Sequence, residues 1–109
     1  MFAFQPNGPI QSFTGATSAP TSVQAVTGNK TQNQQYVLTN TDSTNDCVIG
    51  WGQSDTEAKL NAASGTNVQN CYYLLARSQV VVTAASGAYF SGITASSTAV
   101  VKVQPGYGA

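Results

Sequence analysis

Short apolar segments alternate along the chain with clusters of polar, turn-forming residues. Apolar runs of this length bounded by Gly, Asn, Ser, Asp and Thr are typical of strands joined by turns. The pattern predicts strands at residues 22–26, 35–40, 47–52, 70–76, 77–84, 88–95 and 98–103. The segment 70–76 also fits a loop packed across one end of the sheets.

Alternation with a period of two assigns the faces of two of these strands. In the segment 35–40, Tyr36 and Leu38 share one face and Val37 lies on the other. In the segment 47–52, one face carries Cys47, Ile49 and Trp51. These two apolar faces are expected to point into a common core.

Individual residues predict the character or limits of three further elements. Three consecutive valines make 77–84 the strongest predicted strand, packed on both sides, because β-branched side chains lose χ1 freedom in a helix. Pro105 is expected to end the last strand, since it has no amide hydrogen to donate. Residues 55–62 are the one place for a helical turn, of three or four residues at most, because their apolar positions form no long stripe.

Short connections favour antiparallel pairing, because a parallel crossover needs a dozen or more residues. We therefore predict an all-β fold, an antiparallel two-sheet β-sandwich of the jelly-roll or immunoglobulin-like kind, in residues 22–109. A small closed β-barrel is the alternative. The chain has 109 residues, which is the size of one domain.

Residues 1–21 differ from the rest and are expected to form an extended N-terminal arm. They are broken by Pro and Gly, yet they carry the large apolar side chains of Phe2, Phe4, Ile10 and Phe13. Such side chains gain free energy by docking, either on the sandwich of the same chain or on a neighbouring subunit or other protein. Removing residues 1–13 is expected to leave the sandwich folded and to abolish assembly.

The composition argues against several classes of function. The chain has four basic and four acidic residues, no His, and 42 Ser, Thr, Asn and Gln residues among its 109. A neutral chain lacks the Lys and Arg that bind phosphates, so no nucleic-acid partner is expected. No apolar run is long enough to span a bilayer, and the first residues do not resemble a signal peptide. Neither a membrane association nor secretion is expected.

The sequence has few residues that could act in catalysis or bind a metal ion. Without His the commonest general base and metal ligand are missing, so we expect no enzyme activity, no metal and no cofactor. Asp42 and Asp46 lie in a turn-forming run, and Asp55 and Glu57 suit the start of a helix, so all four acids are expected to be structural. The two cysteines, Cys47 and Cys71, are expected to be reduced core thiols, with a disulfide as the alternative.

The order of segments in the C-terminal half resembles a known group of proteins. A Gly-containing strand (CVIGWGQS) and an apolar segment leading into a Val-rich strand (YYLLARSQVVVTA) precede the stretch AYFSGITASSTAVVKVQPGYG. This arrangement, with its closing Pro-Gly-x-Gly, resembles small β-sandwich virion proteins encoded by tailed bacteriophages. The resemblance covers residues 35–108.

The resemblance implies a non-enzymatic virion structural protein. The expected role is that of a capsid decoration or cement protein, assembled in the bacterial cytoplasm, which binds at junctions of the major capsid protein and stiffens the shell. A homo-oligomer, such as a trimer, is implied. A tail, collar or fibre-base component is the alternative within this class, with another virion protein as its partner. We expect the protein interface to use Phe2, Phe4, Ile10, Phe13, Arg77 and Tyr107.

A second hypothesis is a carbohydrate-binding module, since small β-sandwiches present aromatic and amide side chains to sugars. Its candidate aromatic platforms are Trp51, Tyr72, Tyr73, Tyr89 and Tyr107. Packing in the core or at an interface is the competing explanation for these residues. Trp51 is in phase with Ile49, and the Tyr pair adjoins Leu74.

Overall fold

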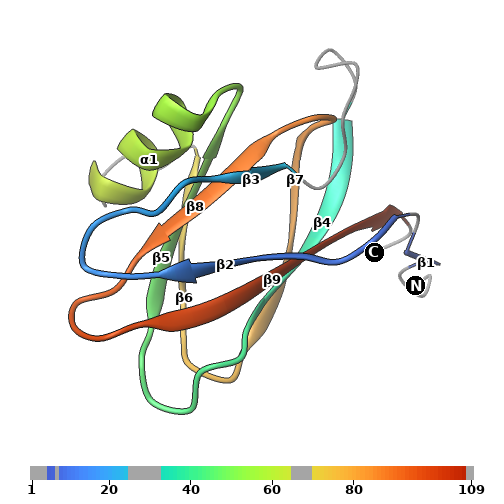
Figure 1. Ribbon diagram of the computed structural model, residues 1–109. Coiled ribbons are helices and arrows are strands. Elements are labelled where there is room, and N and C mark those ends of the chain that lie inside the picture. Colours follow the sequence, from blue (N-terminus) through green and yellow to red (C-terminus); the bar gives the residue numbers. More distant parts are fainter. Residues whose placement is uncertain (1–4, 7, 25–32, 65–69, 108–109) are drawn as a thin grey trace.

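The computed structural model describes residues 5–6, 8–24, 33–64 and 70–107 (Figure 1). These residues form β1 (Gln5–Pro6), β2 (Gln11–Gly15), β3 (Val23–Gln24), β4 (Asn33–Asn40), β5 (Cys47–Gly52), α1 (Asp55–Ser64), β6 (Cys71–Leu74), β7 (Gln79–Ala85), β8 (Tyr89–Ile93) and β9 (Ala99–Tyr107).

The strands form two antiparallel sheets that pack together as a sandwich. The first sheet has the order β1-β9-β4-β7, and β2 also pairs with β9. The second sheet has the order β3-β8-β5-β6. The predicted all-β two-sheet sandwich is confirmed, and the sheets do not close into a barrel.

The core lies between the sheets and follows the predicted alternation. Tyr36 and Leu38 of β4 are buried, whereas Val37 is only partly covered. The predicted inward face of β5 is likewise buried, with Trp51 9% exposed. The ring of Phe90 from β8 joins the two sheets, since its centroid lies 4.8 Å from that of Tyr36 and 6.0 Å from that of Trp51.

Two expectations about strands are wrong. β9 does not end at Pro105 but continues to Tyr107, because the residues on both sides of the proline keep their β4 or β1 partners and Pro105 itself lies opposite Tyr36. β7 is packed on one side only. It forms the edge of the first sheet, and Val81 on its outer side is 38% exposed.

The helix is also longer than expected, at ten residues. The Ser54 hydroxyl caps it by accepting the amide of Glu57 at 3.2 Å. Ala58 and Ala62 are buried against β5, where a Cβ on Gly50 would come within 2.7 Å of the Ala58 carbonyl oxygen. Close packing on a glycine thus stabilises a helix that has no long apolar stripe. Figure 1 shows α1 on the outer side of the second sheet, beside β5 and β8.

The described part of the expected arm belongs to the sandwich. Residues 11–15 form β2, which pairs with β9 from Gln11↔Val103 to Gly15↔Ala99. Phe13 is 5% exposed and is part of the core cluster. Its ring occupies space that a side chain on Gly92 would fill, since a Cβ there would lie 2.8 Å from Phe13 Cε1.

The boundary expected at residue 21 is therefore not a boundary of the fold. Phe13 anchors its own chain and is not available to a partner, because it cannot leave the core without opening a cavity. Removing residues 1–13 would take away a core residue and most of a strand, so the expectation that the sandwich tolerates this deletion is corrected. Phe2 and Phe4 lie outside the described residues.

The two cysteines are not joined in a disulfide. They lie on neighbouring strands but at different positions of the ladder, with Cys47 opposite Leu74 and Cys71 opposite Gly50. Cys47 is buried in the core as expected, whereas Cys71 is only partly covered. Burial raises the pKa of the Cys47 thiol to about 11.

Candidate functional site

The outer face of the first sheet carries a shallow groove of about 280 Å³, which we call the valine groove. It crosses three neighbouring strands, because Val37 of β4 lies opposite Val81 of β7 and opposite Gln104 of β9. The next position along β4, Thr39, lies opposite Gln79 and Lys102. The residues lining the groove are Ile10, Val37, Thr39, Gln79, Val81, Lys102 and Gln104.

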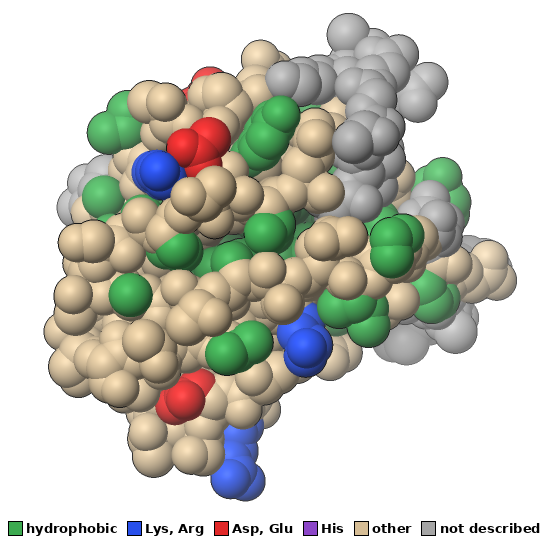
Figure 2. Space-filling view, in the orientation of Figure 1, with side chains coloured by type: hydrophobic (Ala, Val, Ile, Leu, Met, Phe, Trp, Pro, Cys, Tyr) green, Lys and Arg blue, Asp and Glu red, His purple; other side chains and the backbone are tan. Residues whose placement is uncertain are grey.

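The valine groove is open and nearly free of charge. Ile10 is 53% exposed, and Lys102 is the one charged residue among the described residues that line it. Val100 of β9 adds a further exposed apolar side chain on the same sheet. Figure 2 shows that, on the side in view, charged side chains are few, and that apart from one adjacent acidic and basic pair they are separated by uncharged ones. Such a surface can be desolvated at little electrostatic cost.

The structure brings only part of the predicted interface together. Ile10 lines the valine groove, and Tyr107 is exposed at the end of the same sheet, opposite Gln5 of β1. Arg77 is exposed in the turn between β6 and β7, has a positive φ of 56°, and does not line the groove. Val81 is not among the predicted interface residues, although the run of three valines was a signal in the sequence.

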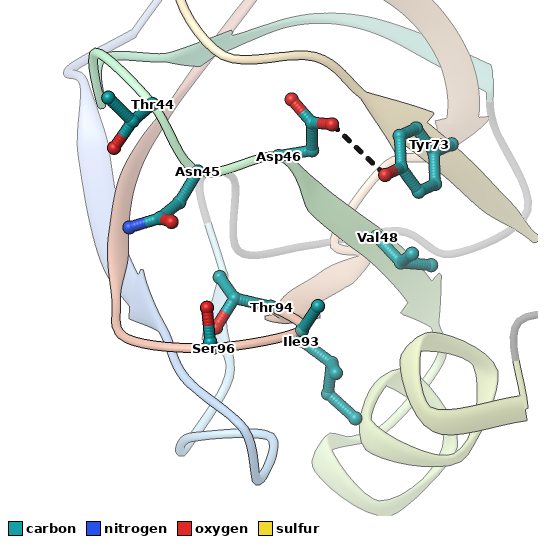
Figure 3. A pocket seen from close by; sticks show the side chains of 9 residues that line it. Thr44, Asn45, Asp46, Val48, Tyr73, Ile93, Thr94 and Ser96 are labelled. Carbon is teal, nitrogen blue, oxygen red and sulfur yellow. Dashed lines mark hydrogen bonds between the residues drawn. The ribbon is translucent and has the colours of Figure 1, made fainter.

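A second hollow, of about 350 Å³, lies on the outer face of the second sheet, and we call it the Tyr73 pocket (Figure 3). Its floor is a row across three strands, because Val48 of β5 lies opposite Tyr73 of β6 and opposite Ile93 of β8. α1 packs against β5 and β8 on the same face, over Gly50. The lining residues are Thr44, Asn45, Asp46, Val48, Tyr73, Ile93, Thr94, Ala95 and Ser96.

One wall of the Tyr73 pocket is a turn held by its own side chains. Oδ2 of Asp42 accepts the amides of Thr44 at 2.9 Å and of Asn45 at 2.7 Å. These backbone hydrogen bonds lower the pKa of the Asp42 carboxyl. The side-chain amide of Asn45 donates to the Thr98 carbonyl at 3.0 Å, which ties this wall to the turn before β9. The structural role expected for Asp42 is thereby confirmed.

Asp46 connects this wall to the aromatic side of the pocket. Its Oδ1 accepts the Ala76 amide at 2.8 Å, and its Oδ2 accepts the Tyr73 hydroxyl at 3.0 Å. The hydrogen bond from Tyr73 to Asp46, together with the carboxylate charge, raises the pKa of the phenol. Tyr73 is 60% exposed, so a largely open ring is held at its hydroxyl end. Figure 3 shows the Tyr73 hydroxyl directed toward Asp46.

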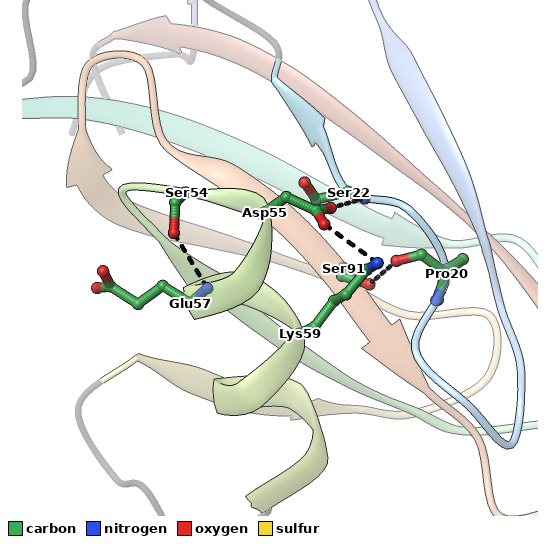
Figure 4. A network of polar contacts seen from close by, with 7 residues as sticks. All are labelled: Pro20, Ser22, Ser54, Asp55, Glu57, Lys59 and Ser91. Atoms are coloured by element: carbon green, nitrogen blue, oxygen red, sulfur yellow. Dashed lines mark hydrogen bonds and ion pairs between the residues drawn. The ribbon is translucent and has the colours of Figure 1, made fainter.

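The other acid cluster stabilises the start of α1 (Figure 4). Oδ1 of Asp55 accepts the Ser22 amide at 2.7 Å, and its Oδ2 lies 3.1 Å from Nζ of Lys59. The Ser22 hydrogen bond and the Lys59 ammonium group lower the pKa of Asp55 to about 2. The Ser91 hydroxyl donates to the Pro20 carbonyl at 2.8 Å and fixes the segment before β3. The helix-start role predicted for Asp55 is confirmed.

Among the described residues, no group of three or more His, Cys, Asp or Glu side chains is placed to hold a metal ion. No helix in this part of the chain is long and apolar enough to cross a membrane. No family model, curated protein or solved structure matches the chain.

Proposed function

We propose that the chain is a non-enzymatic structural protein of a virion, and specifically a capsid decoration or cement protein. In this proposal it binds at junctions of the major capsid protein and stabilises the shell. The observation that carries the proposal is the valine groove, a nearly uncharged hollow that the described residues leave open and that is lined in part by Ile10, Val37 and Val81. The resemblance of residues 35–108 to small virion β-sandwich proteins supports the same role.

The groove has the properties of an interface core. Interface centres are depleted in charged residues, and here the described lining combines three apolar side chains with amides and a hydroxyl around one lysine. Val81 in the lining and Val100 on the same sheet are each 38% exposed, so a partner that covers them removes apolar surface from water.

Weak attachment of each copy is sufficient for this role. A decoration protein is displayed at many equivalent positions, and an oligomer that engages several of them at once gains avidity without new contacts. We therefore propose a homo-oligomer, such as a trimer, on the capsid surface. A tail, collar or fibre-base location is the alternative in the same class, and the same groove would serve it.

Sedimentation with separated virus parts tests the proposal. Purified chain is mixed with capsid shells that lack it, and in parallel with isolated tails from the same virus, and each mixture is centrifuged through sucrose. We expect the chain to sediment with the shells in a saturable, stoichiometric amount. Sedimentation with tails alone would assign it to the tail, and sedimentation with neither would contradict a virion attachment role.

A further inference from the structure

The Tyr73 pocket lies on the opposite side of the sandwich from the valine groove, because the two hollows lie on the outer faces of different sheets. A partner that covers the groove leaves the pocket accessible. From the chemistry of this pocket we propose that it binds a neutral saccharide, with one sugar ring on the floor formed by Tyr73, Val48 and Ile93. The proposal does not depend on capsid attachment.

The floor suits the apolar side of a sugar ring. Tyr73, Val48 and Ile93 occupy one cross-strand row on three adjacent strands, so their side chains form a continuous apolar strip. Tyr73 contributes an aromatic surface that is 60% exposed. The C–H groups on one side of a pyranose can lie against such a surface, while its hydroxyls point to the rim. A volume of about 350 Å³ is at the small end of ligand pockets, which suits a short saccharide.

The rim supplies hydrogen-bonding groups suited to hydroxyls. Thr44 and Ser96 are exposed and contribute hydroxyls, of which that of Thr44 also donates to Oδ2 of Asp42 at 3.3 Å. The Asn45 side chain donates through its nitrogen to the Thr98 carbonyl, which leaves its Oδ1 to accept a hydrogen bond from the ligand. In Figure 3 Asn45 comes from the turn before β5 and Ser96 from the turn after β8, and both line the hollow. A polyhydroxylated ring is the ligand class that uses both an apolar floor and such a rim.

The charges exclude other ligand classes. Among the described residues that line the pocket, Asp46 has the one carboxyl group and none carries a basic group, so an anionic ligand would be repelled. A metal cation is disfavoured as well, because both oxygens of Asp46 already accept hydrogen bonds, from Ala76 and from Tyr73. A neutral ligand is not repelled by the Asp46 carboxylate and does not need its oxygens as ligands.

The pocket is ordered before a ligand arrives. The Asp42 turn fixes Thr44 and Asn45, and Asp46 fixes the hydroxyl end of Tyr73. Rigid binding groups lose little conformational entropy on association, which matters for a ligand that makes few contacts.

The experiment uses the 109-residue chain labelled with ¹⁵N and the methyl glycosides of glucose, galactose, mannose and N-acetylglucosamine at millimolar concentrations. We expect at least one glycoside to shift the amide resonances of residues 44–48 and 93–96 together with that of Tyr73. The methyl glycoside of glucuronic acid should bind more weakly than that of glucose, because of Asp46. If none of the four neutral glycosides shifts these resonances, or if the shifts map elsewhere, the proposal is overturned.

The neighbouring tyrosines provide a matched pair of variants. Tyr73→Ala removes the aromatic ring from the floor of the pocket. The affinity of this variant for the responding glycoside should be lower than that of the wild type by about tenfold or more. Tyr72→Ala removes an exposed ring that lies opposite Ile49 and does not line the pocket, so it should bind like the wild type. Equal binding by all three proteins, each checked for folding by its amide spectrum, would contradict the role of Tyr73.

Discussion

The hydroxyl of Tyr73 donates a 3.0 Å hydrogen bond to Oδ2 of Asp46, a residue 27 positions earlier in the chain. The bond joins the residue just before β5 to the outer side of β6, and the second oxygen of Asp46 extends it to the Ala76 amide. A single carboxyl group thus holds both the turn that follows β6 and the aromatic side of the pocket.

The first prediction concerns the titration of Tyr73. Because Asp46 raises the pKa of the phenol, Asp46→Asn should lower the pKa of Tyr73 toward its ordinary value of 10.0. NMR detection of the Tyr73 ring carbons as the pH rises measures this directly. An unchanged titration in the variant would show that Asp46 does not hold the hydroxyl in solution.

The second prediction concerns Phe13, which is 5% exposed in the core. Phe13→Ala should lower the free energy of unfolding by about 3–5 kcal/mol, because it removes a buried ring and leaves a cavity. Thr14→Ala, at an exposed position of the same strand, should change it by less than about 0.5 kcal/mol. Urea unfolding of the two variants makes the comparison. Similar small effects would mean that β2 does not contribute to the core.

The third prediction concerns pH and Asp55. Its pKa falls from 3.8 to about 2 in the folded chain, so the charged carboxylate stabilises the fold at pH values above the unfolded pKa. That contribution should be constant near neutral pH and should disappear as the pH falls from about 5 toward 2. Asp55→Asn lacks it, so the difference in urea midpoint between wild type and variant should shrink over that range. A difference that does not change with pH would contradict this assignment.

The fourth prediction concerns the buried thiol. Burial raises the pKa of Cys47 to about 11, and the thiolate is the form that reacts with alkylating reagents. In a Cys71→Ser background, Cys47 should remain unmodified by iodoacetamide at neutral pH in the folded protein and react fully in denaturant. Mass spectrometry reads out both states. Rapid modification of the folded protein would show that Cys47 is accessible.

Alternation along the chain was sufficient to predict the sandwich and its inward faces. Tyr36, Leu38 and Ile49 are buried as their period-two positions require. Such patterns report what each strand buries, but not which strand lies at an edge. They also do not show that the outer face of the first sheet is open: Val81 of the edge strand β7 and Val100 of the internal strand β9 are each 38% exposed there.

The elements that sequence reasoning missed depend on contacts between distant residues. The length of α1 comes from packing on Gly50, and the place of β2 comes from the space that Gly92 leaves for Phe13. The Tyr73 pocket also depends on a contact between residues that are distant in the sequence. Asp46 was expected in a turn, and Tyr73 was one of several candidate aromatics. They meet because β5 and β6 pair with Val48 opposite Tyr73, which places Asp46, just before β5, within reach of the Tyr73 hydroxyl.

The most direct test of the central claim is the affinity of a groove variant for capsid shells. Val81→Glu places a charge in the valine groove, and Thr56→Glu places the same charge at an exposed position of α1. Both variants should fold, since both sites are exposed. In sedimentation with shells, we predict that Val81→Glu lowers the affinity by about tenfold or more, whereas Thr56→Glu binds like the wild type. Equal binding by the two variants would contradict attachment through the valine groove.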